Sequence, residues 1–282
     1  MQSTNNKKIG AITMARNDEF FLSRWIAYYG SRLGEENLYI YLDGEDQTMP
    51  ENKGNANIIH RERIPGQVIA AEKGRLGYLS QVAANLLKTY DLIIGVDADE
   101  FLAVDPACGK SLHEYLSEIS VPVSVSALGL DIGQNMNCES KLDRNQPFLK
   151  QRSYAFLSPR YTKPCVISKP VRWGSGFHRI KGHNFHIDKN LYLFHFGCVD
   201  YDMIMDRFQD KDRIATGRTR HLRKRLRAID TITKGKTLDG NKWIPIARRI
   251  QSFLRPIYAL NKPSMGGWKL VVKYPDRFKN IV

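Results

Sequence analysis

The first hundred residues alternate short apolar runs with segments whose apolar residues recur at helical spacing. The apolar runs predict strands over 8–14, 38–44, 57–64 and 91–102, and the helical spacing predicts helices over 15–34 and 72–89. Asn17 or Asp18 is expected to cap the first helix, and Gly34 to end it. This order of strands and helices favours an α/β fold with a mainly parallel sheet and helices on its faces.

The alternation weakens after Leu102. Helices are predicted over 111–119 and 201–215, and strands over 121–130 and 191–197. Between these strands, residues 131–190 are rich in Gly, Asn, Pro, aromatic residues and His, without a clear period. Asp200 stands near the start of the last of these helices, where a cap is expected.

Charge divides the chain of 282 residues unevenly. The net charge is +14, but residues 1–210 hold 24 basic and 25 acidic side chains, whereas residues 211–282 hold 19 and 4. Hydrophobic residues at 42% and charged residues at 26% exclude wholesale disorder and a fibrous chain. We therefore expect a nearly neutral main body, 1–210, followed by a basic amphipathic C-terminal extension, 211–282.

Four cysteines lie far apart with no Cys-x-x-Cys pair, which disfavours a zinc knuckle or a disulfide scaffold and favours a reducing compartment. No apolar run approaches the roughly 20 residues that cross a bilayer. The polar start MQSTNNKK leads directly into the first strand, so no signal peptide is expected. A cytoplasmic protein, with any membrane contact peripheral, is the expectation.

A pair of carboxylates follows the apolar run 92–96. Asp97 and Asp99 are spaced i and i+2, which in extended backbone puts both side chains on one face. Two such carboxylates repel each other unless a cation lies between them. Mg²⁺ or Mn²⁺ is the natural partner, with water and substrate phosphates completing its shell. The alternative is a solvated turn or helix cap, which the position after a buried strand disfavours.

Three stretches carry a family resemblance: MARNDEFFLSRWIAYYGSRLG, YIYLDGEDQT and IIGVDADEFL. In this order and spacing they resemble the GT-A glycosyltransferases of the family 2-like group. The residues that match that group's N-terminal signature are Asn17, Asp18, Phe21, Leu22 and Trp25. Asp18 stands where the family has Glu, and Arg24 replaces an acidic residue. The resemblance covers 1–105 well and 160–210 loosely.

The resemblance implies a GT-A catalytic domain with a nucleotide-sugar half, 1–105, and an acceptor half, 106–210. It implies inverting transfer from a nucleoside-diphosphate sugar, with UDP as the expected nucleotide and Mn²⁺ or Mg²⁺ as the metal. The cation would neutralise charge on the departing phosphates. Carried over by position, the nucleotide contacts are Ala15, Arg16, Asn17 and Asp43, and the metal motif is Asp97 and Asp99, with Asp99 the more direct ligand.

Further site residues come from the looser part of the resemblance. Lys163 and His178 are expected at the donor phosphate or the acceptor, with Lys169 as an alternative to Lys163, because a lysine supplies a point charge suited to a pyrophosphate. His195 aligns with a third metal ligand, and neutral imidazole suits Mn²⁺. The alternative for His195 is a core histidine. His183 and His186 more simply line a loop.

Inverting transfer also needs a base for the acceptor hydroxyl. Asp131 is the first candidate, followed by Glu139 and His178. The alternative for Asp131 is a turn or cap residue. The Glu-Asp pair that usually marks the base in the family is absent.

The basic extension has two features. Residues 218–227 hold six Arg or Lys in ten positions. A helix between Pro245 and Pro256 would place apolar residues on one face, namely Ile246, Ile250, Phe253 and Leu254, with Ile257 just beyond. A basic amphipathic helix of this kind suits an anionic membrane surface and a lipid-linked acceptor. Packing on the main body and an oligomer contact are the alternatives.

The sequence thus predicts a metal-dependent inverting glycosyltransferase that acts on a glycan or glycolipid in surface polysaccharide assembly. A nucleotidyltransferase also needs paired carboxylates, but MARNDEFF is not the Gly-rich loop such enzymes carry. A nucleic-acid- or membrane-binding protein on a degenerate transferase fold is the other alternative. No nucleic acid is expected, because residues 1–210 carry no positive excess.

Overall fold

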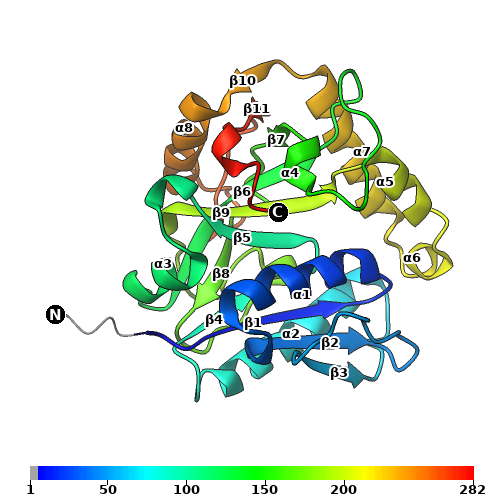
Figure 1. The fold of residues 1–282 in the computed structure, drawn as a ribbon, viewed down its shortest axis with the longest axis vertical. Helices are drawn as coiled ribbons and strands as arrows, with labels where there is room; N and C mark the ends of the chain where they lie inside the picture. Colours follow the sequence, from blue (N-terminus) through cyan, green and yellow to red (C-terminus); the bar gives the residue numbers. More distant parts are fainter. Residues whose placement is uncertain (1–5) are drawn as a thin grey trace.

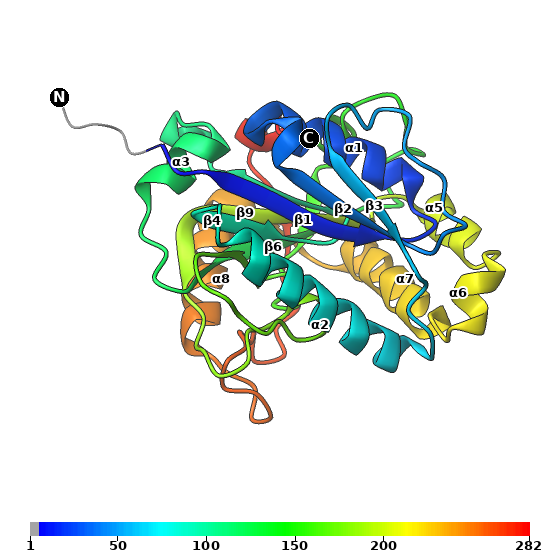
Figure 2. The same ribbon diagram turned by 90° about the horizontal axis from the view of Figure 1, so that it is seen from below.

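The computed structural model describes residues 6–282, so most of the polar start lies outside the described residues. Its N-terminal half is a parallel sheet with strand order β3-β2-β1-β4. The elements are β1 (Ile9–Ala15), α1 (Glu19–Leu33), β2 (Leu38–Asp43), β3 (Asn57–Arg61), α2 (Val68–Leu86) and β4 (Leu92–Gly95). Helix α1 covers one face of these strands and α2 covers the other (Figures 1 and 2).

The sheet continues past β4 with mixed strand directions. The further strands are β5 (Glu100–Val104), β6 (Ser124–Gly133), β7 (Tyr154–Phe156), β8 (Lys163–Ile167), β9 (Ile187–Cys198), β10 (Thr237–Asp239) and β11 (Val271–Lys273). Strand β8 runs antiparallel to β4 and to β6. Strand β9 lies between β5 and β6, antiparallel to the first and parallel to the second.

Short helices connect these strands, and longer ones follow β9. The α-helices are α3 (Leu112–Glu118), α4 (Phe148–Gln151), α5 (Tyr201–Arg207), α6 (Lys211–Ala215), α7 (Thr219–Lys234) and α8 (Gly240–Phe253). Single 3₁₀ turns occur at η1 (Glu35–Asn37), η2 (Pro106–Cys108), η3 (Ser175–Phe177) and η4 (Asp276–Phe278). Helix α7 packs on β6, β7 and β9, and β11 pairs with β7. The division at residue 210 stays a prediction.

The expected fold class is confirmed: the chain is α/β, with a parallel core flanked by helices on both faces. Helix α1 illustrates why. Its buried face includes Phe21, Trp25 and Tyr29, spaced four residues apart, so one side of the helix packs on the sheet. Asp18 occupies the N-cap position, but its side chain pairs with Arg207 and makes no capping hydrogen bond. Gly34 ends the helix at φ 87°, a conformation that glycine adopts without strain.

Two predicted elements are each divided in the structure. The strand predicted over 91–102 is wrong: β4 ends at Gly95, a turn follows, and β5 leaves to pair with β9. Asp97 and Asp99 therefore lie in that turn rather than in extended backbone. The helix predicted over 201–215 is α5 and α6, because Asp210 caps a new helix by accepting from the backbone of Asp212 and Arg213.

The limits of two other helices differ from the predicted ones. Helix α2 begins at Val68, four residues before the predicted start. Helix α8 begins at Gly240 and passes through Pro245, which was expected to bound it. The proline removes only one intrahelical hydrogen bond, and burial of Ile244 and Ala247 holds the helix on the sheet. None of the helices within residues 6–282 is long and apolar enough to cross a membrane. The expected cytoplasmic location stays a prediction.

Candidate active site

Polar residues gather at the carboxyl ends of three neighbouring strands. Arg16 and Asn17 directly follow β1, Asp43 ends β2, and Asp97 and Asp99 follow β4. Since β2 and β4 both pair in parallel with β1, their carboxyl ends meet at one edge, where open α/β sheets bind ligands. The strand order therefore brings together polar residues from three separate parts of the sequence.

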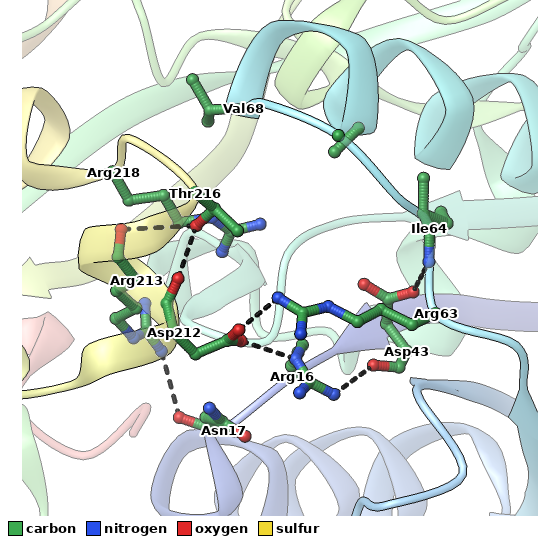
Figure 3. A pocket seen from close by; sticks show the side chains of 12 residues that line it. Arg16, Asn17, Asp43, Arg63, Ile64, Val68, Asp212, Arg213, Thr216 and Arg218 are labelled. Atoms are coloured by element: carbon green, nitrogen blue, oxygen red, sulfur yellow. Dashed lines mark hydrogen bonds and ion pairs between the residues drawn. The ribbon is translucent and has the colours of Figure 1, made fainter.

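A pocket lies at this edge beside β1 and β2 (Figure 3). Arg16 donates from Nη1 to the backbone oxygen of Asp43 at 2.7 Å. The Asp43 carboxylate accepts from the backbone nitrogen of Ile64 at 2.8 Å. Asn17 lines the pocket with a positive φ of 49°, whereas Ala15 is a buried residue of β1 and is not among the lining residues. The pocket thus offers a guanidinium, an amide and a carboxylate to a ligand.

Helix α6 forms one side of this pocket. Asp212 accepts from Arg16 Nε at 2.7 Å and also pairs with Arg63. Arg213 donates to the backbone oxygen of Asn17 at 3.0 Å. The free space left is only about 20 Å³, roughly what one water molecule needs. A larger ligand would therefore have to displace some of the side chains that line the pocket.

Asp97 belongs to a buried ion-pair group. Lys163 Nζ lies 3.0 Å from Asp97 and 2.5 Å from Glu100, and Arg75 lies 2.9 Å from Asp97. Burial by itself would raise the pKa of Asp97, but Lys163 and Arg75 outweigh it and hold that pKa below its usual value. Burial raises the pKa of Glu100 to about 7. Lys163 is only 1% exposed, so it organises the carboxylates instead of facing open solvent.

Asp99 belongs to a second group, centred on His195. Its Oδ2 lies 2.8 Å from Arg225 Nη2 and 3.5 Å from His195 Nε2. The other ring nitrogen, Nδ1, lies 2.6 Å from Asp131 Oδ1, and the ring of Tyr161 stacks on the imidazole at 3.7 Å. The register explains this arrangement: His195 on β9 stands opposite Glu100 on β5 and Asp131 on β6.

The electrostatics of this group follow from its burial. Burial alone would lower the pKa of His195, but Asp99 and Asp131 outweigh it and raise that pKa to about 9. Burial would likewise raise the pKa of Asp99, but His195 and Arg225 hold it well below its usual value. Asp99 is therefore ionised at neutral pH, and its charge is balanced by Arg225 and by His195, which is protonated at this pH.

His178 lies on the Asp97 side of the site, in the loop between β8 and β9. Its Nδ1 is buried without a hydrogen-bond partner within the described residues. Burial, together with the positive charges of Lys163 and Lys262, holds the pKa of His178 well below its usual value. The imidazole is neutral at pH 7 and has a free nitrogen.

The remaining predicted residues lie elsewhere. Lys169 is exposed beyond the far end of β8, away from the edge that holds Lys163. His183 and His186 are exposed in a loop. Glu139 accepts from the backbone nitrogens of Asn135 and Ser153, at 2.8 and 2.6 Å, and so closes a turn.

Several charged residues of the site were not predicted from the sequence: Arg63, Arg75, Asp212, Arg213, Arg218 and Arg225. Each reaches the site from a helix or loop outside the matched motifs. Arg225 belongs to the basic stretch 218–227, but nothing in that stretch connects it with Asp99. Glu100 was also missed, although it directly follows Asp99 and its burial in a strand was a usable signal.

Asp99 and His195 are the two side chains that would hold a divalent cation, which would replace the Arg225 guanidinium on Asp99 and the proton on the imidazole. A carboxylate oxygen and an imidazole nitrogen face each other, and a second carboxylate holds the far side of the imidazole, which is the usual arrangement behind a metal-binding histidine. Among residues 6–282 no group of three or more His, Cys, Asp or Glu side chains could hold a metal. Two protein ligands leave the other positions to water and substrate oxygens, as Mg²⁺ commonly has them.

Comparison with known proteins gives only distant likenesses. No family model and no curated protein matches the chain. One similar solved structure is the WbbM bifunctional glycosyltransferase, at TM-score 0.26 and 15% identity, covering 46% of this chain and 24% of that one. Another is mannose-1-phosphate geranyltransferase from Thermus thermophilus, at TM-score 0.29 and 11% identity, covering 97% of this chain and 77% of that one. Both are transferases, but these scores are too low to assign a function.

Proposed function

We propose that the chain is a metal-dependent glycosyltransferase that moves a sugar from a nucleoside diphosphate to a hydroxyl of a glycan or lipid-linked acceptor. The observation that carries the proposal is one sheet edge with two adjoining parts: the pocket of Arg16 and Asp43, and the group of Asp99, His195 and Asp131. Inversion, UDP as the nucleotide and a role in surface polysaccharide assembly belong to the same proposal.

In this proposal the pocket holds the nucleotide. The Asp43 carboxylate accepts from a base or ribose donor, and Asn17 contributes its amide. Arg16 and Arg63 both pair with Asp212, and Arg16 also pairs with Asp46, so an anionic ligand would compete with these carboxylates for the two guanidiniums. The diphosphate then extends toward Asp99, which follows the neighbouring strand.

Asp99 and His195 would hold Mn²⁺ or Mg²⁺, which supplies positive charge that offsets the charge of the departing diphosphate. Asp131 orients His195 by accepting from its Nδ1. Lys163 and Arg75 keep Asp97 ionised and in place at the other end of the turn. Arg225 pairs with Asp99 and adds a further cation to this side of the site.

In this proposal His178 acts as the base. Burial, Lys163 and Lys262 hold its pKa low and weaken it as a base, and the negative charge of a bound diphosphate would raise that pKa. The neutral imidazole accepts the proton of the acceptor hydroxyl while the hydroxyl oxygen forms the new bond to the anomeric carbon and the nucleoside diphosphate leaves. Asp131, the first candidate from the sequence, already binds His195 and is only 3% exposed, so it acts as a positioning residue.

Unpaired positive charge near the site favours an acceptor that carries phosphate. Four residues of α7 line a hollow of about 410 Å³: Arg220, Arg223, Lys224 and Arg227. Arg160 lies close enough to lower the pKa of Lys224, and no acidic side chain within residues 6–282 pairs with these five cations. A lipid-linked acceptor with a phosphate group matches this charge.

The test is nucleotide release from a panel of nucleoside-diphosphate sugars, measured with Mn²⁺ and with EDTA. We expect release of the diphosphate with one or more donors in Mn²⁺ only, and at least about a hundredfold loss in Asp99→Asn. Asp230→Asn, on the exposed side of α7, is the matched control and should keep the wild-type rate. Release of pyrophosphate from a nucleoside triphosphate would instead indicate a nucleotidyltransferase and overturn the proposal.

A further inference from the structure

The segment that follows α8 exposes an unusual amount of apolar surface. Among the described residues, 12 large apolar side chains are exposed, and six of them lie within residues 253–268. They are Phe253 (82% exposed), Leu254 (44%), Ile257 (101%), Tyr258 (81%), Leu260 (74%) and Trp268 (57%). Scattered single residues of this kind are ordinary on protein surfaces, but a cluster marks an interaction site.

The same segment is held in a defined shape. Ser264 donates from its backbone nitrogen to the oxygen of Leu254 at 3.0 Å, closing a loop, and Ala259 and Met265 are buried beneath it. Asn261 Nδ2 donates to the backbone oxygen of Ile180 at 2.7 Å. We call residues 253–268 the apolar loop; it projects from the lower edge of the molecule in Figure 2. Its buried anchors leave the exposed side chains facing outward.

Along the sequence, the charged residues within and beside the apolar loop are all basic. Residues 240–275 contain seven Lys or Arg and no Asp or Glu. Lys242, Arg249, Lys269 and Lys273 are exposed. Apolar and aromatic side chains bordered by cations, without acidic residues, match the interface of an anionic bilayer. A second copy of this chain is a poor partner, because it would bring the same positive charge against this face.

The apolar loop also lies at the rim of the candidate active site. Asn261 binds Ile180, two residues after His178, and Lys262 is close enough to lower the pKa of His178. Across the rim, Arg160 acts on both Lys262 and Lys224 of α7. The hydrogen bond from Asn261 therefore holds the apolar loop against the loop that carries His178.

We propose that the apolar loop inserts Phe253, Ile257 and Leu260 shallowly into an anionic lipid surface, with the neighbouring basic residues on the headgroups. This docking follows from the apolar loop and its basic neighbours alone and does not depend on the proposed function. Its consequence, that the acceptor enters from the membrane, rests on the proposed function.

The test is flotation of the full chain with vesicles of phosphatidylcholine alone and of phosphatidylcholine and phosphatidylglycerol in equal parts. We expect binding to the mixed vesicles and about tenfold or greater loss of it in Ile257→Asp. Ile69→Asp is the matched control, because Ile69 is 82% exposed on α2, outside the apolar loop, and should bind as wild type does. Melting curves of both variants report on folding.

Tryptophan fluorescence gives a second readout. Trp25 and Trp173 are buried, whereas Trp268 is exposed in the apolar loop. Mixed vesicles should shift the emission to the blue in the wild type and much less in Trp268→Phe, which keeps an aromatic ring and most of the binding.

Three results would overturn the proposal: equal vesicle binding by wild type and Ile257→Asp, no binding to mixed vesicles, or self-association by light scattering that Ile257→Asp abolishes. Failure of the proposed function is separate, since nucleotide release without lipid should be unchanged in Ile257→Asp. Asp99→Asn should float with vesicles as the wild type does, even though it does not release nucleotide.

Discussion

At the scale of single residues, the site is a set of paired charges. Asp97 and Asp99 were predicted to share one cation, yet each has its own partners, Lys163 for the first and Arg225 for the second. The sequence predicted that both carboxylates follow a buried apolar run, but not the turn in which they lie. The partners could not be predicted either, because the pair of Asp99 and Arg225 spans 126 positions and depends on how α7 packs.

The first prediction concerns Asp131, which holds the far side of His195 at 2.6 Å. Asp131→Asn removes the carboxylate while keeping the size of the side chain. We expect Mn²⁺ affinity to fall about 10- to 100-fold by calorimetry, because such outer partners fix the orientation and basicity of a metal-binding histidine.

Asp230→Asn is the control for this measurement, and melting curves of the metal-free variants check that both fold. Unchanged Mn²⁺ affinity in a folded Asp131→Asn variant would contradict the role given to Asp131.

At the scale of elements, the pattern of apolar residues did not predict the turn that ends β4 or the cap that begins α6. Apolar runs predicted β1 and β2 closely, because buried parallel strands are continuously apolar. The run 91–102 is equally apolar on both sides of its carboxylates, so the turn that separates β4 from β5 leaves no gap in the pattern. Helix α6 was read as part of a longer helix, and its position over the pocket depends on ion pairs across 196 positions.

The second prediction tests α6 as a lid. Asp212→Asn should speed association of a fluorescent nucleotide about two- to fivefold in stopped flow, since the amide no longer forms ion pairs with Arg16 and Arg63. Asp206→Asn, on exposed α5, should leave the rate unchanged. An equal or slower rate in Asp212→Asn would mean that α6 does not limit entry.

At the scale of the whole molecule, the basic segment 211–282 is partly built into the folded core. The surplus in 211–282 was correctly located from composition, but composition has no information on packing. Strand β11 pairs with β7, and Phe278 is fully buried against Tyr192 and Phe194, with ring centroids 5.1 and 5.6 Å apart. Part of the basic segment thus contributes to the core, while the apolar loop remains exposed.

The third prediction compares two phenylalanines of this segment. Phe278→Ala should lower the free energy of unfolding by about 3–5 kcal/mol, as for other large buried aromatic residues. Phe253→Ala, at an 82% exposed position, should change it by no more than about 0.5 kcal/mol. Urea unfolding measures both. A small effect in Phe278→Ala would indicate that residues 211–282 fold apart from the main body.

Calorimetry of UDP binding to the wild type and to Asp99→Asn, each with Mn²⁺ and with EDTA, tests whether Asp99 holds a metal ion that helps to bind the nucleoside diphosphate. We expect Mn²⁺ to strengthen UDP binding by the wild type at least about tenfold and to have no such effect in Asp99→Asn. UDP affinity that is the same with Mn²⁺ and with EDTA, or the same gain from Mn²⁺ in wild type and variant, would contradict this role of Asp99.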